Sequence, residues 1–289
     1  MPVNKEKRET TINRKREEYA NFVKSYYYNN DSEPDEMERK ILKQIRDDVH
    51  RTQPEFPLFH EKSIQEMMNR VLYVWHVRHP ASGYVQGIND LLTPFLAAFI
   101  SEYITVDYDT FTIPQDFSAK LGEEELKKLE ADCYWCLSKI LDGVLDNYTS
   151  SQIDAQKSMT KIKEITKKID AELCSNLESK DIDFKFFSLR WIFCLLVREF
   201  PLKVGMRLFD TYISDEQGFS VLHIYVCAAL LLKWSVKLKK MNFPEIMVFL
   251  QNMPTRDWSE QDIEIIIAEA YVFMTLYEDS KGHLNTQPK

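Results

Sequence analysis

Two short segments decide how this sequence is interpreted: residues 45–52, Ile-Arg-Asp-Asp-Val-His-Arg-Thr, and residues 83–90, Gly-Tyr-Val-Gln-Gly-Ile-Asn-Asp. Glycine is scarce, with seven in 289 residues, yet two glycines bracket a Tyr-Val-Gln core in the second segment. Closely spaced glycines mark backbone that turns sharply or approaches another surface. Spacing alone favours an ordinary interpretation, in which Gln86 is a turn residue and Arg51 pairs with Asp48 near a helix end.

Length and composition limit the classes of function that the chain can have. The 289 residues suffice for one large domain or two lobes that share a core. Hydrophobic residues make up 44% of the chain and aromatic residues 12%, so an extensive core is expected. The formal net charge of −8 argues against nucleic acid or anionic lipid as the main partner, because both bind clustered positive charge.

The cysteines and the N-terminus predict a soluble, cytoplasmic protein. The five cysteines are odd in number and no secretory signal precedes them, so reduced thiols are expected. The N-terminus offers no glycine for myristoylation, and no apolar run approaches the ~20 residues of a transmembrane segment.

The hydrophobic pattern predicts an all-α fold with no sheet, because apolar residues recur at helical spacing and no segment alternates as a strand. Ser63 and Glu66 have the spacing of a capping box at one helix start, and His79-Pro80 should end that helix. A surface loop is expected at 105–122. The predicted helices cover residues 14–28, 63–78, 88–103, 123–148, 162–177, 184–200, 219–238, a short segment from 243, and 259–277.

The same pattern divides the chain into three parts. Residues 1–39 are a charged N-terminal segment, partly helical, followed by the loop 29–35. Residues 40–278 form the domain, with approximate lobes 40–180 and 181–278. The polar tail 279–289 is expected to fray.

Several patterns associated with chemistry have a simpler explanation. Cys133 and Cys136 have dithiol spacing, but no strand precedes them as in a thioredoxin-like site and no second ligand pair for zinc follows, so Cys133 is assigned to core packing. The six histidines show no metal-ligand spacing, and neither a nucleophile elbow nor a phosphate-binding loop is present. Arg190 lies in the most apolar helix and needs an acceptor, for which Glu199 and Asp210 are candidates; an internal ion pair is preferred.

Three motifs together resemble the signatures of the TBC domain, the catalytic domain of Rab GTPase-activating proteins. The first spans Ile45 to Thr52, the second is the Gly83 to Asp90 segment, and the third combines Arg190-Trp191 with Glu199 and Phe209-Asp210. The match covers about residues 40–278 in the family's order. The amino-acid sequence of residues 78–83 and 249–252 resembles the Golgi-associated branch of this family, which is typified by the yeast Gyp1 protein.

This resemblance implies a V-shaped, two-lobed, multi-helix domain and a mechanism with two catalytic side chains. Arg51 would neutralise charge that develops on the transferred phosphoryl group, and Gln86 would orient the attacking water. The family pattern gives the remaining motif residues supporting roles. Asp48 and Thr52 would hold the loop that carries Arg51. Tyr84 and Asn89 would fix the turn that carries Gln86, and Gly83 and Gly87 would permit that turn. The other two supporting residues are Asp90 and Arg190.

The resemblance also implies the partner and the location. The partner would be a Rab-family GTPase in its GTP-bound form, which carries the GTP and Mg²⁺, so the chain needs no cofactor of its own. Peripheral recruitment to the Golgi membrane is expected, without a transmembrane segment.

Two positions depart from the family pattern. His50 stands where relatives often have proline, which would leave the Arg51 loop less stiff. Phe209 replaces a tryptophan, which is interpreted as an exchange of one core side chain for another.

Two other functions stay open. The chain could instead be a catalytically silent Rab-binding module or a helical scaffold. Substitution of Arg51 separates these functions, because only the catalytic one predicts lost turnover with folding preserved.

Overall fold

A computed structural model describes residues 4–28, 35–104, 107, 110, 112, 114, 117–148 and 153–278. Within these residues every regular element is helical, which confirms the all-α class. The chain separates into two compact units, residues 1–150 and residues 151–289. This boundary lies before the approximate position 180 expected from the sequence, because the helix from Ile153 to Ile169 packs against the second unit.

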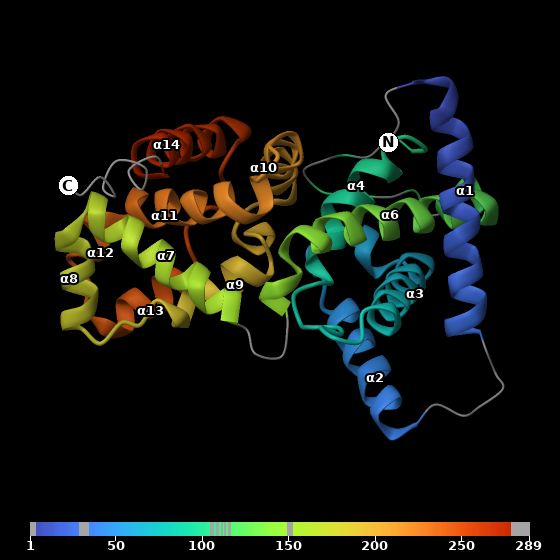
Figure 1. Ribbon diagram of the computed structural model, residues 1–289, viewed down its shortest axis with the longest axis horizontal. Coiled ribbons are helices and arrows are strands. Elements are labelled where there is room, and N and C mark those ends of the chain that lie inside the picture. The colour runs from blue at the N-terminus through green and yellow to red at the C-terminus, as the bar shows by residue number, and fades with distance from the viewer. Residues whose placement is uncertain are drawn as a thin grey trace, which may run out of the picture. The chain divides into compact units, whose positions relative to one another are not determined.

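Unit 1 is organised around its longest helix, α6 (Glu123–Val144). This helix packs against α1 (Glu6–Phe22), α3 (Lys62–Arg78) and α4 (Thr93–Ile100), as Figure 1 shows. Its predicted apolar stripe, from Cys133 to Tyr148, is buried throughout. The other elements of unit 1 are the π-helical η1 (Val23–Tyr27), α2 (Glu36–His50), η2 (Pro57–His60), η3 (Asp90–Leu92), α5 (Phe117–Leu121) and η4 (Leu145–Tyr148).

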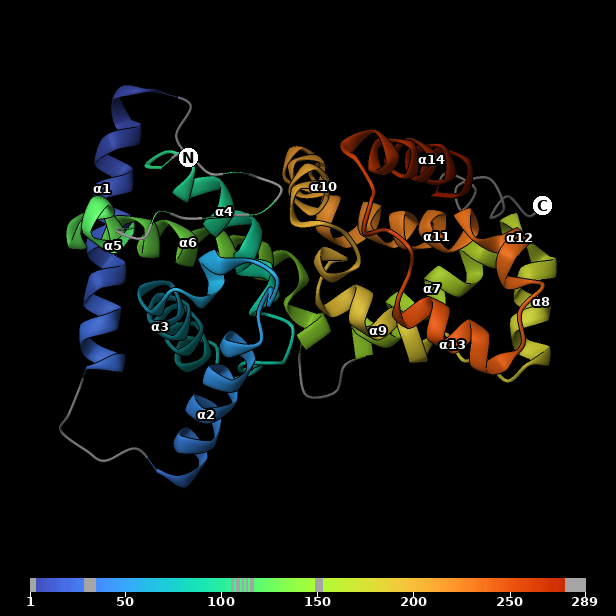
Figure 2. The same ribbon diagram turned by 180° about the vertical axis from the view of Figure 1, so that it is seen from behind.

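Unit 2 is built on α11 (His223–Lys233), in which every residue from His223 to Leu231 is buried. Helices α7 (Ile153–Ile169) and α14 (Glu260–Glu278) pack on α11, and both views show α14 along its outer side (Figures 1 and 2). The remaining elements are α8 (Ala171–Ser179), α9 (Lys185–Phe193), η5 (Val197–Glu199), α10 (Leu202–Ser214), η6 (Gly218–Leu222), α12 (Ser235–Leu238) and α13 (Phe243–Gln251).

The N-terminal segment is part of unit 1 and is more ordered than its charge indicated. Helix α1 begins at Glu6, eight residues before the predicted start, and its buried Tyr19 packs on Tyr134 of α6. Arg16 donates to Asp132 at 3.0 Å, and the Trp135 indole donates to the Lys15 carbonyl at 2.8 Å. Contacts with α6 therefore stabilise α1, although its charged sequence had indicated a helix exposed to solvent.

Three local predictions were wrong. The capping box at Ser63 does not form, because α3 starts at Lys62 after Glu61 and has no side-chain cap. The predicted helix 184–200 ends at Phe193, since Leu195 and Leu196 adopt φ of 47° and 64°. The helix expected over 88–103 is shorter, because a turn and the 3₁₀ segment η3 precede α4.

The remaining helix predictions agree with the structure in outline. Asp170 separates α7 from α8 and accepts from the Leu173 amide at 2.9 Å, so the single pattern over 162–177 covers two helices. α5 lies within the predicted loop 105–122, part of which falls outside the described residues. Almost all of the loop 29–35 and the tail 279–289 also lie outside them.

Candidate functional site

The C-terminus of α2 presents Arg51 to solvent beside a buried acid. Arg51 is the C-cap residue of α2, and its backbone N–H donates to the Asp48 carbonyl at 3.1 Å. The Asp48 side chain is 3% exposed and the Arg51 side chain 63% exposed, and the two form an ion pair. The exposed Arg51 side chain is thus paired with the buried Asp48 carboxylate, as the i, i+3 spacing predicted.

The segment after α3 presents Gln86 in a similar way. His79 is the C-cap of α3, directly before Pro80, as predicted. Gly83 and Gly87 have φ of 65° and 111°, in the region that favours glycine, so the turn needs both. Tyr84 and Gly87 are buried, whereas Gln86 between them is exposed. The turn therefore exposes the amide side chain of Gln86, while Tyr84 and Gly87 in the same turn are buried.

One buried hydrogen-bond network joins these two exposed side chains. The Tyr84 hydroxyl lies 2.8 Å from Asp48 Oδ2 and 3.2 Å from Asn89 Oδ1. Asn89 Oδ1 also accepts from the Gly87 amide at 3.1 Å, and Asn89 Nδ2 donates to Thr52 Oγ1 at 3.0 Å. Thr52 Oγ1 donates to the Asp48 carbonyl at 2.9 Å. All four side chains are at least 94% buried, so the network fixes both turns against one another.

Two predicted supporting residues lie elsewhere in the structure. Asp90 is buried at the start of η3, and its carbonyl accepts from the Thr93 hydroxyl at 2.8 Å. Arg190, in unit 2, donates to Glu199 at 2.6 and 2.8 Å and to the Gln251 carbonyl at 3.1 Å. Burial raises the pKa of Glu199, and Arg190 opposes that rise. The preferred interpretation of Arg190 as an internal ion-pair residue is consistent with this geometry.

The sequence pattern did not reveal the contribution of His76. Its Nδ1 atom accepts from the Tyr84 backbone N–H at 2.9 Å, so it anchors the Gln86 turn to α3. A Cβ atom at Gly83 would lie 3.2 Å from the same nitrogen, which gives a second reason for glycine there. Burial lowers the pKa of His76, which favours the neutral ring that can accept this bond. Only its position in the last turn of α3 could have indicated this role.

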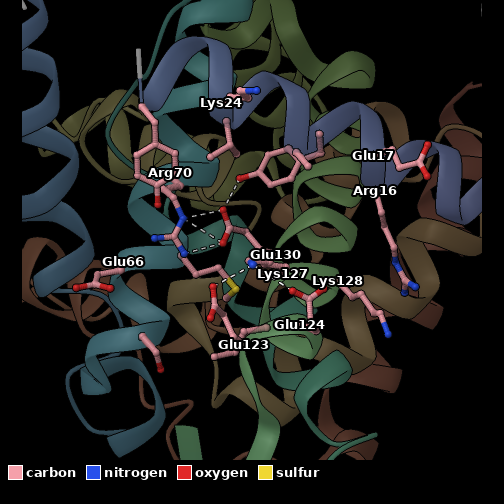
Figure 3. A pocket seen from close by; sticks show the side chains of 17 residues that line it. Arg16, Glu17, Lys24, Glu66, Arg70, Glu123, Glu124, Lys127, Lys128 and Glu130 are labelled. Carbon is pink, nitrogen blue, oxygen red and sulfur yellow. Dashed lines mark hydrogen bonds and ion pairs between the residues drawn. The ribbon is translucent and has the colours of Figure 1, made fainter. Parts of the chain in front are cut away.

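One pocket of unit 1 is separate from these two turns. It has a volume of about 580 Å³ and is lined by residues of α1, η1, α3 and α6 (Figure 3). At its base Arg70 donates to Glu130 at 2.7–3.1 Å, and the Tyr19 hydroxyl donates to the same carboxylate at 2.7 Å. Neither Arg51 nor Gln86 lines this pocket.

The described residues offer no other chemical centre of the kinds considered from the sequence. They contain no group of three or more His, Cys, Asp or Glu side chains that could hold a metal ion. All five cysteines are free thiols, and Cys133 is buried, with a pKa that burial raises. In the part of the chain with described structure, no helix combines the length and apolar character needed to cross a bilayer.

Comparison with protein families matches residues 3–239 to the Rab-GTPase-TBC domain. This chain belongs to that family. The match begins in the N-terminal segment, consistent with the packing of α1 into unit 1. It confirms the family that the three motifs indicated.

Individual relatives support the same assignment for this TBC domain. It is 46% identical over 285 residues to the GTPase-activating protein gyp1 of Schizosaccharomyces pombe, covering 98% of this chain and 54% of that protein. It is 42% identical over 284 residues to human TBC1 domain family member 22B, covering 98% and 55%. The chain thus spans about half the length of the curated relatives it matches.

A solved structure extends the likeness to three dimensions. The crystal structure of the Ypt/Rab-GAP domain of Gyp1p matches with a TM-score of 0.88 and 40% sequence identity, covering 96% of this chain and 85% of that one. A flagellar RabGAP TBC domain of Chlamydomonas matches in fold alone, with a TM-score of 0.64 and 17% identity, covering 94% and 85%. The predicted Gyp1-like branch is therefore confirmed.

Proposed function

We propose that this TBC domain accelerates GTP hydrolysis by a Rab-family GTPase, with Arg51 and Gln86 entering the nucleotide site of the partner together. The observation that carries the proposal is the pairing of two exposed side chains with one buried network beneath them. Family membership supplies the class of reaction and of partner.

The chemistry of the two side chains suits the transfer of a phosphoryl group to water. The planar guanidinium of Arg51 presents a fork of N–H donors and can donate to two phosphate oxygens at once. The Gln86 amide can accept a hydrogen bond from the attacking water and donate one to a phosphate oxygen. Neither task needs a proton-transfer residue with a shifted pKa, because phosphoryl transfer is catalysed mainly by positioning and electrostatics.

The buried network accounts for the precision that such a mechanism requires. A catalytic group gives its full effect only when its supporting shell holds it near the productive geometry. Here Tyr84 touches both Asp48 under Arg51 and Asn89 under the Gln86 turn. Arg51 must exchange part of its pairing with Asp48 for the phosphates of the partner. The Tyr84 hydroxyl stays on Asp48 during this exchange, so the buried carboxylate keeps a hydrogen-bond donor.

The partner would be the GTP-bound Rab, which brings the nucleotide and Mg²⁺, so the TBC domain contributes side chains and no cofactor. Action in the cytoplasm, with peripheral recruitment to Golgi membranes, follows from likeness to the Gyp1 branch. Imaging of the tagged chain against a Golgi marker tests this location, and a uniform cytoplasmic signal would contradict it.

The decisive experiment measures GTP hydrolysis by a panel of purified Rab GTPases. We expect the wild-type protein to accelerate at least one Rab, and Arg51→Ala to lower that rate by about 10³-fold or more. Gln86→Ala should also abolish most of the acceleration, and Arg51→Lys should not restore it, because lysine lacks the planar fork.

Two substitutions on α2 provide matched controls. Arg46→Ala and Gln44→Ala remove an exposed arginine and an exposed glutamine from α2, the helix that ends at Arg51, and both should leave the rate unchanged. Thermal melting of each variant separates the alternatives. Rab binding without acceleration by wild type would make the chain a silent binding module. Lower melting temperatures of the Arg51 and Gln86 variants would instead make these residues structural.

A further inference from the structure

Helix α14 carries an exposed apolar stripe on the side that faces away from α11. Ile265 is 50% exposed, Val272 54% and Leu276 60%, and the exposed Ala268 lies between them. Large apolar side chains that gather on one exposed face commonly mark an interaction surface. These four residues are called the α14 stripe below.

Helical geometry places the α14 stripe on one line. At 100° per residue, its four members lie within about 80° of one another around the axis, opposite the buried Ile263, Ile266 and Ala270. From Ile265 to Leu276 the stripe extends for about 16 Å, or three helical turns. Figures 1 and 2 show α14 on the outside of unit 2. The stripe therefore matches one further helix of three to four turns.

The charges on α14 are of one sign. The helix carries four acidic residues with described side chains and no Lys, Arg or His: Glu260, Asp262, Glu264 and Glu269. At one edge of the stripe Glu264 accepts from Arg207 of α10 at 3.0 Å. Glu260 is paired as well, with Lys203 of α10 at 3.5 Å. At the other edge Glu269 forms no ion pair within the described residues. The negative charge that is available to a partner is therefore that of Asp262 and Glu269.

These charges discriminate among possible occupants. A second copy of the chain would place the acidic edge of one α14 against the acidic edge of the other. An anionic bilayer would be repelled for the same reason. A helix with an apolar face flanked by lysine or arginine matches both the stripe and its border.

We propose that the α14 stripe is a docking surface for a basic amphipathic helix of a partner protein. The surface lies in unit 2 and does not depend on the catalytic roles of Arg51 and Gln86.

The test uses two synthetic helical peptides of about four turns, with leucines at i, i+3, i+4 and i+7. One peptide has lysines beside the leucines, and the other has glutamates at the same positions. Fluorescence anisotropy with the full chain should show the lysine peptide binding about tenfold more tightly. The double variant Val272→Gln, Leu276→Gln should weaken binding of the lysine peptide about tenfold, because two apolar contacts are lost at unchanged charge.

Two further variants control for location and for charge. Val236→Gln removes a side chain that is 72% exposed on α12 and should leave peptide binding unchanged. Glu269→Lys should weaken binding of the lysine peptide and strengthen binding of the glutamate peptide. Since all these positions are exposed or partly exposed, melting temperatures should stay within a few degrees of wild type.

Four results would overturn the proposal. Equal affinity for the two peptides would remove the charge argument. An unchanged affinity in the double glutamine variant, or an equal loss in Val236→Gln, would place binding elsewhere. Concentration-dependent dimerisation of wild type that the double variant abolishes would identify the occupant as a second copy of the chain.

Discussion

At the scale of single residues, the Tyr84 hydroxyl is the point where the two exposed turns meet. It contacts Asp48, which pairs with Arg51, and Asn89, which bonds the Gly87 amide and Thr52. The motif predicted these supporting residues individually. The sequence could not show that one hydroxyl bridges them, because residues 36 positions apart meet only through the packing of α2 against α3.

Tyr84→Phe should weaken both turns while leaving the ring packing intact. The buried Asp48 carboxylate would lose a donor, so we expect a loss of about 1–3 kcal/mol in the free energy of unfolding. The GTPase-activating rate should fall by about tenfold, because displaced groups catalyse less well. Denaturant unfolding and hydrolysis assays measure the two effects. Tyr26→Phe, at a residue that is 41% exposed, is the control, and a full rate in Tyr84→Phe would refute the bridging role.

His76 should make the Gln86 turn sensitive to acid. Its Nδ1 atom can accept the Tyr84 amide only when unprotonated, and burial lowers its pKa below the ordinary value of about 6.5. The unfolded chain therefore takes up a proton first, and stability falls as the pH drops from about 6.5 through the folded pKa. The protection factor of the Tyr84 amide, which compares its exchange with that of an unfolded chain at the same pH, should fall over this range. In His76→Gln the fall should be absent, and its persistence there would exclude His76 as the cause.

At the scale of secondary-structure elements, long apolar stripes were predictable and local breaks were not. The stripe of α6 and the burial of α11 follow from helical periodicity. The end of α9 depends instead on Leu195 and Leu196, which adopt positive φ although leucine has no preference for it. Tertiary packing imposes such conformations, so a sequence pattern without glycine or proline gives no sign of them.

Gly218, the first residue of η6, should tolerate no side chain. A Cβ atom there would lie 2.6 Å from the Tyr212 Cα atom, which is backbone and cannot move aside cheaply. We expect Gly218→Ala to lower the free energy of unfolding by about 3 kcal/mol, at the upper end of typical overpacking costs. Gly143→Ala is the matched control, because nothing lies within 4 Å and alanine favours the helix. Equal melting temperatures for the two variants would contradict the packing argument.

At the scale of the whole molecule, composition and motif order were sufficient to indicate the fold class and the family. The extent of each unit was less predictable, because it depends on which helices pack together. The charged sequence of α1 gave little indication that Tyr19 is buried against α6, and the apolar stripe of α7 fits either unit. The candidate site was predictable to a greater degree, since its residues fall in two short segments of fixed spacing.

Global stability should fall on acidification because of His223 in unit 2. The ring is buried, 2.9 Å from the Tyr212 hydroxyl, and burial lowers its pKa to about 3. Between about pH 6.5 and 3 the unfolded chain binds a proton that the folded chain does not. At pH 5 this costs about 2 kcal/mol. Melting curves at pH 7 and 5 should show a smaller shift for His223→Phe than for wild type, and an equal shift would exclude this source.

The central claim is that Arg51 and Gln86 act on the transition state of the partner's reaction. The most direct test is the affinity of the chain for Rab·GDP with and without aluminium fluoride, which mimics the transferred phosphoryl group. We predict that wild type binds the aluminium fluoride form at least about 100-fold more tightly, and that Arg51→Ala and Gln86→Ala lose this preference. Equal affinity of wild type for both forms, or an unchanged preference in either variant, would contradict the account.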